Sequence, residues 1–209
     1  LAGARVTERL RGAGLDGRHS LIVIHVSAGN PFRRWPAASF QALVVALARR
    51  DARRRVVLTS GPSDAEAAQA IAAAARLELG GQADAVPELG EFDLAELRAL
   101  VDRAAVYIGG DSGPVHIAST TRTPIVELLG PTLPERSHPW RDARWYSETV
   151  DAGPLPCRPC HQRTCVPGDF RCLTMITPEQ VVSAAERAMM HRAGGSAGER
   201  SNSNWSALR

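Results

Sequence analysis

Residues suited to chemistry crowd into one short segment, Gly109-Gly110-Asp111-Ser112-Gly113-Pro114-Val115-His116. The apolar run Ala104 to Ile108 before it predicts a buried strand, and residues 115–118 begin a helical pattern. Ser112 suits the N-cap of that helix, and Pro114 suits its first turn, where a missing N–H costs nothing. A helix that begins at a strand end presents free backbone N–H groups, which bind anions. The segment therefore predicts a phosphate site; the alternative is an ordinary turn that needs glycine for its backbone.

Two side chains of this segment extend the prediction from an anion to a sugar-bearing ligand. Asp111 precedes the helix, where its carboxylate is placed to accept hydrogen bonds from sugar hydroxyls. His116 lies one turn into the helix, and we expect its ring to point toward the ligand, although histidines at such positions often pack in the core.

A second segment supplies positive charge. The apolar run Leu21 to Val26 predicts a buried parallel strand, and Ser27, Arg33 and Arg34 lie in the loop that follows it. A guanidinium at that place suits a phosphate and stabilises charge that develops on a leaving group. The alternative is a solvated basic loop in which Trp35 only anchors the next helix.

A third polar loop follows the strand predicted at Val56 to Thr59 and ends at Asp64. The interpretation that the sequence alone favours is that this carboxylate stabilises the start of the next helix through the helix dipole. The functional alternative is a carboxylate that holds ribose hydroxyls.

All four cysteines lie within one short stretch, as Cys157, Cys160, Cys165 and Cys172. Four thiols so close together suggest a structural zinc site, for which His161 is a competing ligand. Free buried thiols and a disulfide are the alternatives.

Strands and helices alternate along the chain, which predicts an α/β fold with a doubly wound parallel sheet. In such sheets ligands bind beyond the carboxyl ends of the strands. We therefore expect the loops at 27–36, 60–64 and 109–116 to converge on one crevice.

Composition narrows the class of protein further. The net charge is +3, and all 25 basic residues are arginines. So mild a charge does not favour nucleic acid as a partner. No apolar run approaches the roughly 18 residues that span a membrane, so a cytoplasmic location is the default expectation. The arginines between positions 49 and 55 fit a solvated face, with an anionic membrane surface as the alternative.

Several motifs, in the right order, resemble one family. Ile24 to Gly29 with Arg33 to Pro36 looks like the first motif of the C-terminal half of family 9 glycosyltransferases, and Gly109 to Ala118 resembles the most specific signature of that family. Leu129 to Thr132 matches the next motif. The stretch Pro156 to Leu173 is similar to the Cys-rich segment of the heptosyltransferase II subgroup.

The resemblance implies an inverting enzyme of GT-B fold that transfers heptose from ADP-heptose to the lipopolysaccharide inner core without a required cofactor. The matched part is the C-terminal, Rossmann-like donor domain. The resemblance implies three segments. Residues 1–20 are a linker and helix from an N-terminal acceptor domain that is missing here. Residues 21–192 are the donor domain, with a Cys-rich loop at 153–173, and residues 193–209 are a disordered tail. The catalytic base is expected in the missing domain, so the chain alone is expected to be inactive. Peripheral contact with the cytoplasmic face of the inner membrane is implied as well.

Site residues carry over by motif. Asp111 resembles the residue that binds heptose hydroxyls, and Ser112 and Gly113 match positions whose backbone meets the diphosphate, with His116 beside them. Arg33 stands where the family often has a phosphate-binding lysine, a departure that leaves Arg34 able to share the role. Two further matches are Ser27, near the phosphates, and Asp64, loosely aligned with a ribose-binding acid.

Two alternatives to heptose transfer stay open. One is a non-catalytic module that binds a nucleotide sugar, and the other is a family 9 transferase that uses a different nucleotide sugar.

Overall fold

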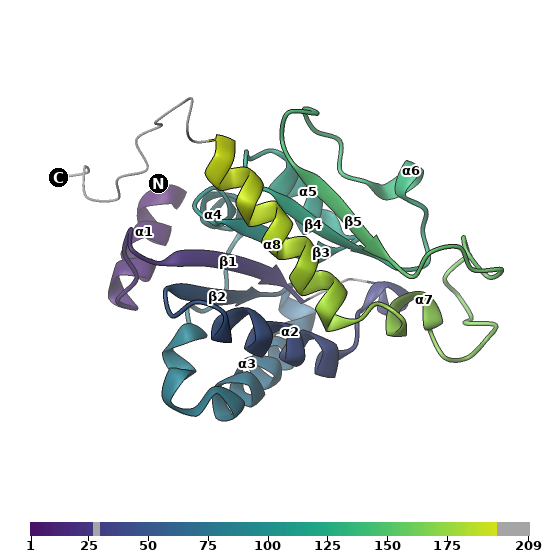
Figure 1. Ribbon diagram of the computed structural model, residues 1–209, viewed down its shortest axis with the longest axis horizontal. Coiled ribbons are helices and arrows are strands. Elements are labelled where there is room, and N and C mark those ends of the chain that lie inside the picture. Colours follow the sequence, from purple (N-terminus) through teal and green to yellow (C-terminus); the bar gives the residue numbers. More distant parts are fainter. Residues whose placement is uncertain (27–29, 196–209) are drawn as a thin grey trace.

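Five parallel strands form a single sheet at the centre of the molecule. The computed structural model describes residues 1–26 and 30–195 (Figure 1). The strand order is β2-β1-β3-β4-β5. In chain order the strands are β1 (Ser20–His25), β2 (Arg54–Thr59), β3 (Val106–Gly110), β4 (Ile125–Leu129) and β5 (Ser147–Asp151).

The order of the strands reverses between β1 and β3. From β1 the chain moves to β2 on one side of the sheet and then returns to add β3 on the other side, so that Ile24 pairs with Leu58 of β2 and with Ile108 of β3. Such a reversal point leaves a crevice at the carboxyl ends of the two central strands, because their following loops turn to opposite faces of the sheet.

Helices cover both faces of the sheet (Figure 1). One face packs against α2 (Ala37–Arg49), α3 (Ala65–Leu79) and α8 (Pro178–Gly195), and the other against α1 (Ala2–Gly12), α4 (Leu94–Val101) and α5 (Gly113–Ser119). Two short helices are α6 (Pro134–Ser137) and α7 (Arg171–Thr174). The 3-10 turns are η1 (Pro31–Arg33), η2 (Pro62–Asp64) and η3 (Gly80–Ala85).

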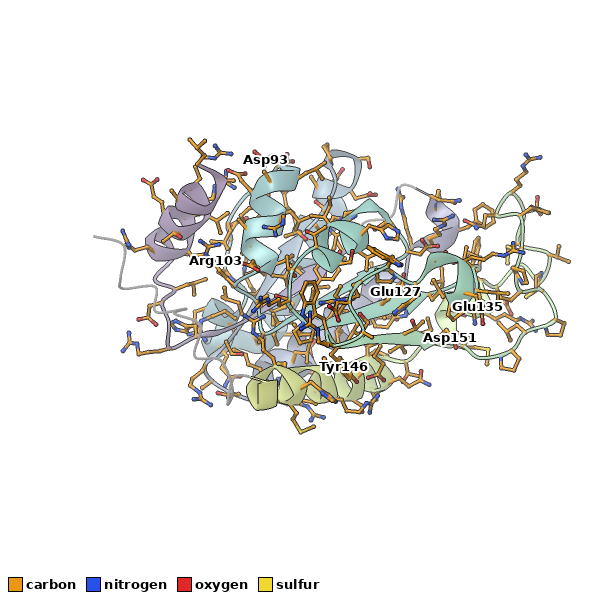
Figure 2. The ribbon with its side chains drawn as sticks, turned by 90° about the horizontal axis from the view of Figure 1, so that it is seen from above. Asp93, Arg103, Glu127, Glu135, Tyr146 and Asp151 are labelled. Atoms are coloured by element: carbon orange, nitrogen blue, oxygen red, sulfur yellow. The ribbon has the colours of Figure 1, made fainter. Side chains whose placement is uncertain are left out.

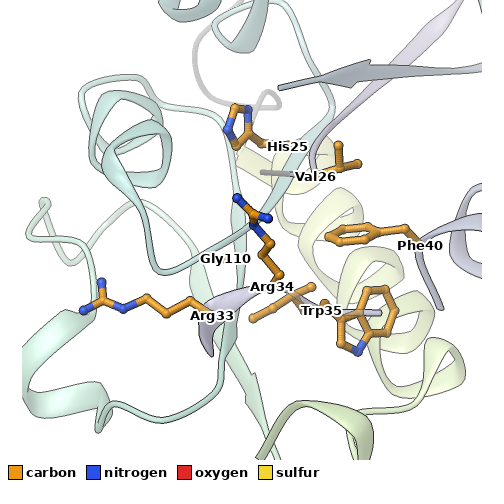
Figure 3. Close-up of a pocket in the computed structure, with 8 residues that line it drawn as sticks. His25, Val26, Arg33, Arg34, Trp35, Phe40 and Gly110 are labelled. Atoms are coloured by element: carbon orange, nitrogen blue, oxygen red, sulfur yellow. The ribbon is translucent and has the colours of Figure 1, made fainter. Parts of the chain in front are cut away.

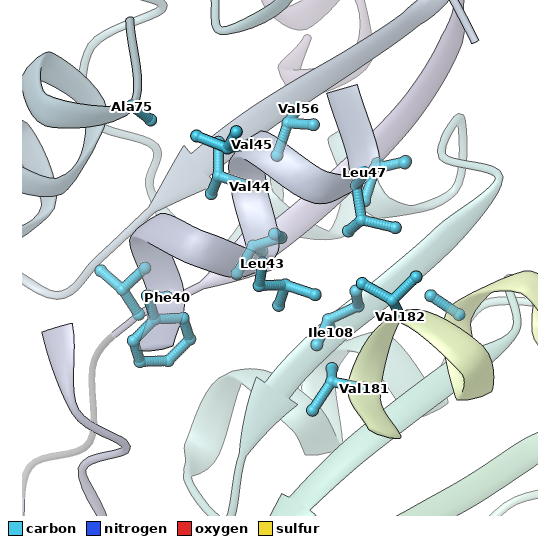
Figure 4. Packing of buried hydrophobic residues seen from close by; sticks show 14 of the residues in the cluster. Phe40, Leu43, Val44, Val45, Leu47, Val56, Ala75, Ile108, Val181 and Val182 are labelled. Carbon is cyan, nitrogen blue, oxygen red and sulfur yellow. The ribbon is translucent and has the colours of Figure 1, made fainter. Parts of the chain in front are cut away.

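The strands are apolar on both faces because both faces are covered. On the α2 side, Leu43 and Leu47 of α2 pack with Ile108 of β3 and Val181 of α8, all of them fully buried (Figure 4). On the other side Tyr107 of β3 joins a second apolar cluster formed with α1, α4 and α5. The predicted fold class, a Rossmann-like doubly wound parallel sheet, is confirmed.

The first helix is packed into the domain. Val6 and Leu10 of α1 are fully buried, and Arg5 Nε lies 2.6 Å from Glu96 Oε1 of α4. The division into a linker, a donor domain and a tail stays a prediction, and residues 196–209 of that tail lie outside the described part of the chain.

Candidate functional site

The loop after β1 is anchored on both sides of its two arginines. Asn30 caps η1, since its Oδ1 accepts a hydrogen bond from the Phe32 N–H at 3.0 Å. Trp35 donates from Nε1 to the Ile176 carbonyl at 3.0 Å and packs edge-on against Phe40. These contacts hold the backbone of Arg33 and Arg34 at the reversal point of the sheet.

Each of the two arginines pairs with a carboxylate from a different strand end. Arg33 Nη1 lies 3.2 Å from Asp111 Oδ2, beyond β3, and Arg34 Nη2 lies 2.9 Å from Asp64 Oδ1, beyond β2. The carboxylate side chains are only 6% and 7% exposed. A carboxylate buried to that extent requires a charged or hydrogen-bonding partner. The three loops therefore meet at one place, as predicted.

Asp111 has a further partner that was not predicted. Thr132 donates from Oγ1 to Asp111 Oδ2 at 2.7 Å. Thr132 follows β4, and the motif that contains it, Leu129 to Thr132, gave no indication of this contact. Asp111 therefore sits between a cation from the loop after β1 and a hydroxyl from the loop after β4.

The glycine turn brings two backbones close together. A Cβ at Gly110 would lie 3.4 Å from the Arg33 carbonyl oxygen, so a side chain there would press on the loop that carries the arginines. Ser112 occupies the N-cap position of α5, but its Oγ donates to the Gly110 carbonyl and makes no capping bond. Gly113 is exposed and has open space around it.

The helix start at α5 is a smaller anion site than the sequence suggested. The helix has seven residues, Pro114 has no N–H, and the Val115 N–H already donates to the Ser112 carbonyl. The positive charge at the crevice therefore comes mainly from Arg33 and Arg34.

Among the described residues, His116 is not placed against the other predicted ligand residues. His116 is exposed on α5, and its carbonyl accepts a hydrogen bond from Ser119 Oγ; its role in binding stays a prediction. Ser27 lies outside the described residues.

A buried histidine that sequence reasoning missed lies under the arginines. His25 ends β1, and its Nδ1 is 3.0 Å from Thr59 Oγ1. Burial lowers the pKa of His25 to about 4, so the ring is neutral at pH 7. It lines a cavity of about 10 Å³ with Arg33, Arg34 and Gly110 (Figure 3), enough for about one water molecule. A cavity of that volume is too small for any ligand much larger than a water molecule.

A second buried ionisable group, Glu127, lies in the middle of β4 (Figure 2). Its side chain is 0% exposed, and its Oε2 is 3.5 Å from both His138 Nδ1 and Thr149 Oγ1. Burial, with the nearby Asp111 charge, raises the pKa of Glu127 to about 8, so that the carboxyl keeps its proton at pH 7. Glu127 occurs within an apolar run of the sequence, and the pattern of that run does not indicate that a polar residue there has a role.

The four cysteines are free and half-buried. Burial and then the charges of Cys160, Cys157 and Cys165 raise the pKa of Cys172, which places the four thiols in one neighbourhood. Among residues 1–26 and 30–195, however, no three His, Cys, Asp or Glu side chains are arranged to hold a metal ion. The zinc site stays a prediction.

Within the same described ranges, no helix combines the length and the apolar character needed to cross a membrane.

Fold and site together define a doubly wound α/β domain whose paired arginines and carboxylates join the strand-end loops at the reversal point of the sheet. Residues 5–169 match the model of glycosyltransferase family 9 (heptosyltransferase). The chain belongs to that family.

A relative in sequence supports the assignment, and two solved structures share the fold. The chain is 31% identical over 186 residues to lipopolysaccharide heptosyltransferase 3 of Escherichia coli, an alignment that covers 88% of this chain and 51% of that protein. The structure of E. coli ADP-heptose lps heptosyltransferase II is similar with a TM-score of 0.69 and 20% identity, over 91% of this chain and 52% of that one. The structure of E. coli heptosyltransferase WaaC with ADP gives a TM-score of 0.60 and 19% identity, over 82% and 45%. This chain therefore spans about half the length of these proteins.

Proposed function

We propose that this chain is the donor-binding half of an inverting glycosyltransferase that moves heptose from ADP-heptose to the lipopolysaccharide inner core. The observation that carries the proposal is the pair of ion pairs, Arg33 with Asp111 and Arg34 with Asp64, at the reversal point of the sheet. Guanidinium groups bind diphosphates, and carboxylates bind the hydroxyls of sugars. The site therefore contains groups that can bind the diphosphate and groups that can bind the sugars of a nucleotide sugar. A relative of similar fold is described with ADP bound.

In the proposed reaction an acceptor hydroxyl attacks the anomeric carbon of the donor, and the bond from that carbon to the diphosphate oxygen breaks. ADP leaves with the bonding electron pair, and Arg33 and Arg34 stabilise the charge on its phosphates. Asp111 holds the heptose hydroxyls, while Asp64 holds the ribose. The base that takes the acceptor proton is assigned to the half of the relatives' length that this chain does not span.

We infer that the enzyme works in the cytoplasm at the inner face of the inner membrane, where its acceptor is assembled. Phosphate charge is carried by arginines, so the transfer requires no divalent metal ion.

The test is a transfer assay on the protein at its full natural length, with ADP-heptose and a lipopolysaccharide core acceptor. Release of ADP is expected from the natural protein and is expected to fall at least about 100-fold in Arg33→Ala, since one lost transition-state donor typically costs that much. The exposed Arg163→Ala should transfer normally. Binding of ADP-heptose without any transfer would favour the non-catalytic module, and transfer from a different nucleotide sugar would change the donor.

A further inference from the structure

One side chain of the Cys-rich loop turns toward the crevice. Most of the loop from His161 to Phe170 is exposed, whereas Gln162 is half-buried. Its Oε1 accepts a hydrogen bond from Arg33 Nε at 2.6 Å and another from Asn30 Nδ2 at 2.9 Å. Gln162 thus ties the loop after β1 to a segment 129 residues further along the chain than Arg33.

These bonds fix the orientation of the Arg33 guanidinium. Nε donates to Gln162, and Nη1 faces both the carbonyl oxygen of Asp111, at 3.3 Å, and its carboxylate, at 3.2 Å. In the described part of the chain, Nη2 of Arg33 has no hydrogen-bond partner. Because a guanidinium is planar and its donors form a rigid fork, holding two nitrogens determines where the third one points.

The backbone at Gln162 indicates that its side chain is needed. Its φ is 57°, in the left-handed region that favours glycine, and the same loop does use glycine at Gly168, where φ is 80°. A side chain in such a conformation persists when its surroundings hold it there, and such residues cluster at functional sites.

The loop that carries Gln162 is fastened at other points. Arg158, whose side chain is 4% exposed, pairs with Asp151 at 2.7 Å, and the Cys160 N–H donates to the Pro131 carbonyl at 3.3 Å. Phe170 packs on Phe32 of η1 with ring centroids 5.4 Å apart. The position of Gln162 against Arg33 is therefore set by the packing of the whole loop.

We propose that Gln162 is a positioning residue for the phosphate site, which holds Arg33 so that Nη2 faces the diphosphate of the nucleotide. The identity of that ligand rests on the proposed function, whereas the contact between Gln162 and Arg33 does not. The experiment therefore has one arm that needs no ligand.

The first arm observes the Arg33 Nε–H by ¹⁵N NMR, with Arg33→Ala to identify its signal. In the natural sequence this proton is expected to give a signal distinct from those of solvated arginines, because Nε is hydrogen-bonded. Gln162→Met, which keeps the length of the side chain and removes the acceptor, should move the signal to the solvated position. The exposed Thr164→Ala is the control in the same loop. An Arg33 signal that does not change in Gln162→Met would overturn the proposal whatever the protein binds.

The second arm measures ADP binding by calorimetry. Gln162→Met is expected to weaken ADP about fivefold, the equivalent of one hydrogen bond. Gln162→Gly should weaken ADP equally without lowering the melting temperature, because glycine suits the left-handed backbone. In an Arg33→Ala background neither change should have a further effect. If the losses of ADP affinity in the Gln162 and Arg33 variants multiplied in the double variants, the two residues would act independently. That result would show that Gln162 only supports the fold and would refute the proposal. Failure of the natural protein to bind ADP would refute the proposed function and leave the NMR arm to decide the role of Gln162.

Discussion

Arg33 and Asp111 are 78 residues apart in the chain, and their side chains meet with Nη1 at 3.2 Å from Oδ2. The contact joins the loops that follow the two central strands, β1 and β3. It also gives the buried carboxylate its counter-ion. In the proposed function Arg33 binds the diphosphate and Asp111 binds the sugar, so the two subsites would lie side by side.

The first prediction concerns the stability of this pair. Arg33→Ala leaves the Asp111 carboxylate buried without its cation, which should lower the free energy of unfolding by about 1–3 kcal/mol. Asp111→Asn in the same background should recover part of the loss, because a neutral amide needs no counter-ion. Urea unfolding measures both. Equal free energies of unfolding for Arg33→Ala and the exposed Arg163→Ala would show that the pair contributes nothing to stability.

The second prediction concerns the first glycine of the turn. A Cβ at Gly109 would lie 2.6 Å from the hydroxyl oxygen of Tyr107, which is fully buried. Gly109→Ala should therefore cost about 1–3 kcal/mol of unfolding free energy through overpacking. Tyr107→Phe removes that hydroxyl, a buried group that has no hydrogen-bond partner among the described residues, and should relieve part of the cost. Gly113→Ala, with nothing within 4 Å of its new Cβ, is the matched control and should be tolerated in the same thermal unfolding assay.

The third prediction is an alkaline loss of stability caused by Glu127. Its ordinary pKa of 4.5 is raised to about 8 in the folded chain, chiefly by burial and next by Asp111. The folded state thus binds a proton that the unfolded state has released, so stability is complete below pH 4.5 and falls as the pH rises through about 8. Glu127→Gln should flatten this fall, measured as the difference in unfolding free energy between about pH 6 and pH 9. The same slope in both proteins would assign the effect to other groups.

The stability that His25 contributes changes with pH in the opposite direction to that of Glu127. It therefore serves as an internal comparison in the same unfolding measurements. Burial lowers its pKa from 6.5 to about 4, so the folded state excludes a proton that the unfolded state binds. Its contribution is present above pH 6.5 and is lost as the pH falls toward 4. The two windows overlap between pH 4.5 and 6.5, where the opposing slopes offset each other, so the stability from these two groups should be highest in that range. Glu127→Gln should leave the fall of stability below pH 4.5 unchanged.

The strand ends could be predicted from sequence, but the pairing of side chains across them could not. Continuous apolar runs identify buried strands, and in a parallel sheet the loops after neighbouring strands meet at one edge. Which arginine meets which carboxylate depends on side-chain directions within irregular loops. His25 and Glu127 are single polar residues inside apolar runs, where periodicity carries no information about them. The inward turn of Gln162 depends on a left-handed backbone that a glutamine does not signal.

The fourth prediction concerns the four cysteines. The sequence predicts that the thiolates of Cys157, Cys160, Cys165 and Cys172 are the ligands of a structural zinc ion. One zinc per chain by elemental analysis, lost in Cys160→Ser, would support the zinc site. Four titratable thiols and no metal in protein purified without chelator would eliminate the zinc interpretation.

The central claim is that Arg33 and Arg34 form a diphosphate site at the reversal point of the sheet. Calorimetric titration with ADP tests it most directly, comparing the natural protein, Arg33→Ala, Arg34→Ala and the exposed Arg163→Ala. We predict that ADP binds the natural protein and Arg163→Ala equally, and that each of the other two variants loses about tenfold or more in affinity, since charge-assisted bonds to phosphate are lost. ADP binding that is absent from the natural protein, or unchanged in both Arg33→Ala and Arg34→Ala, would contradict the claim.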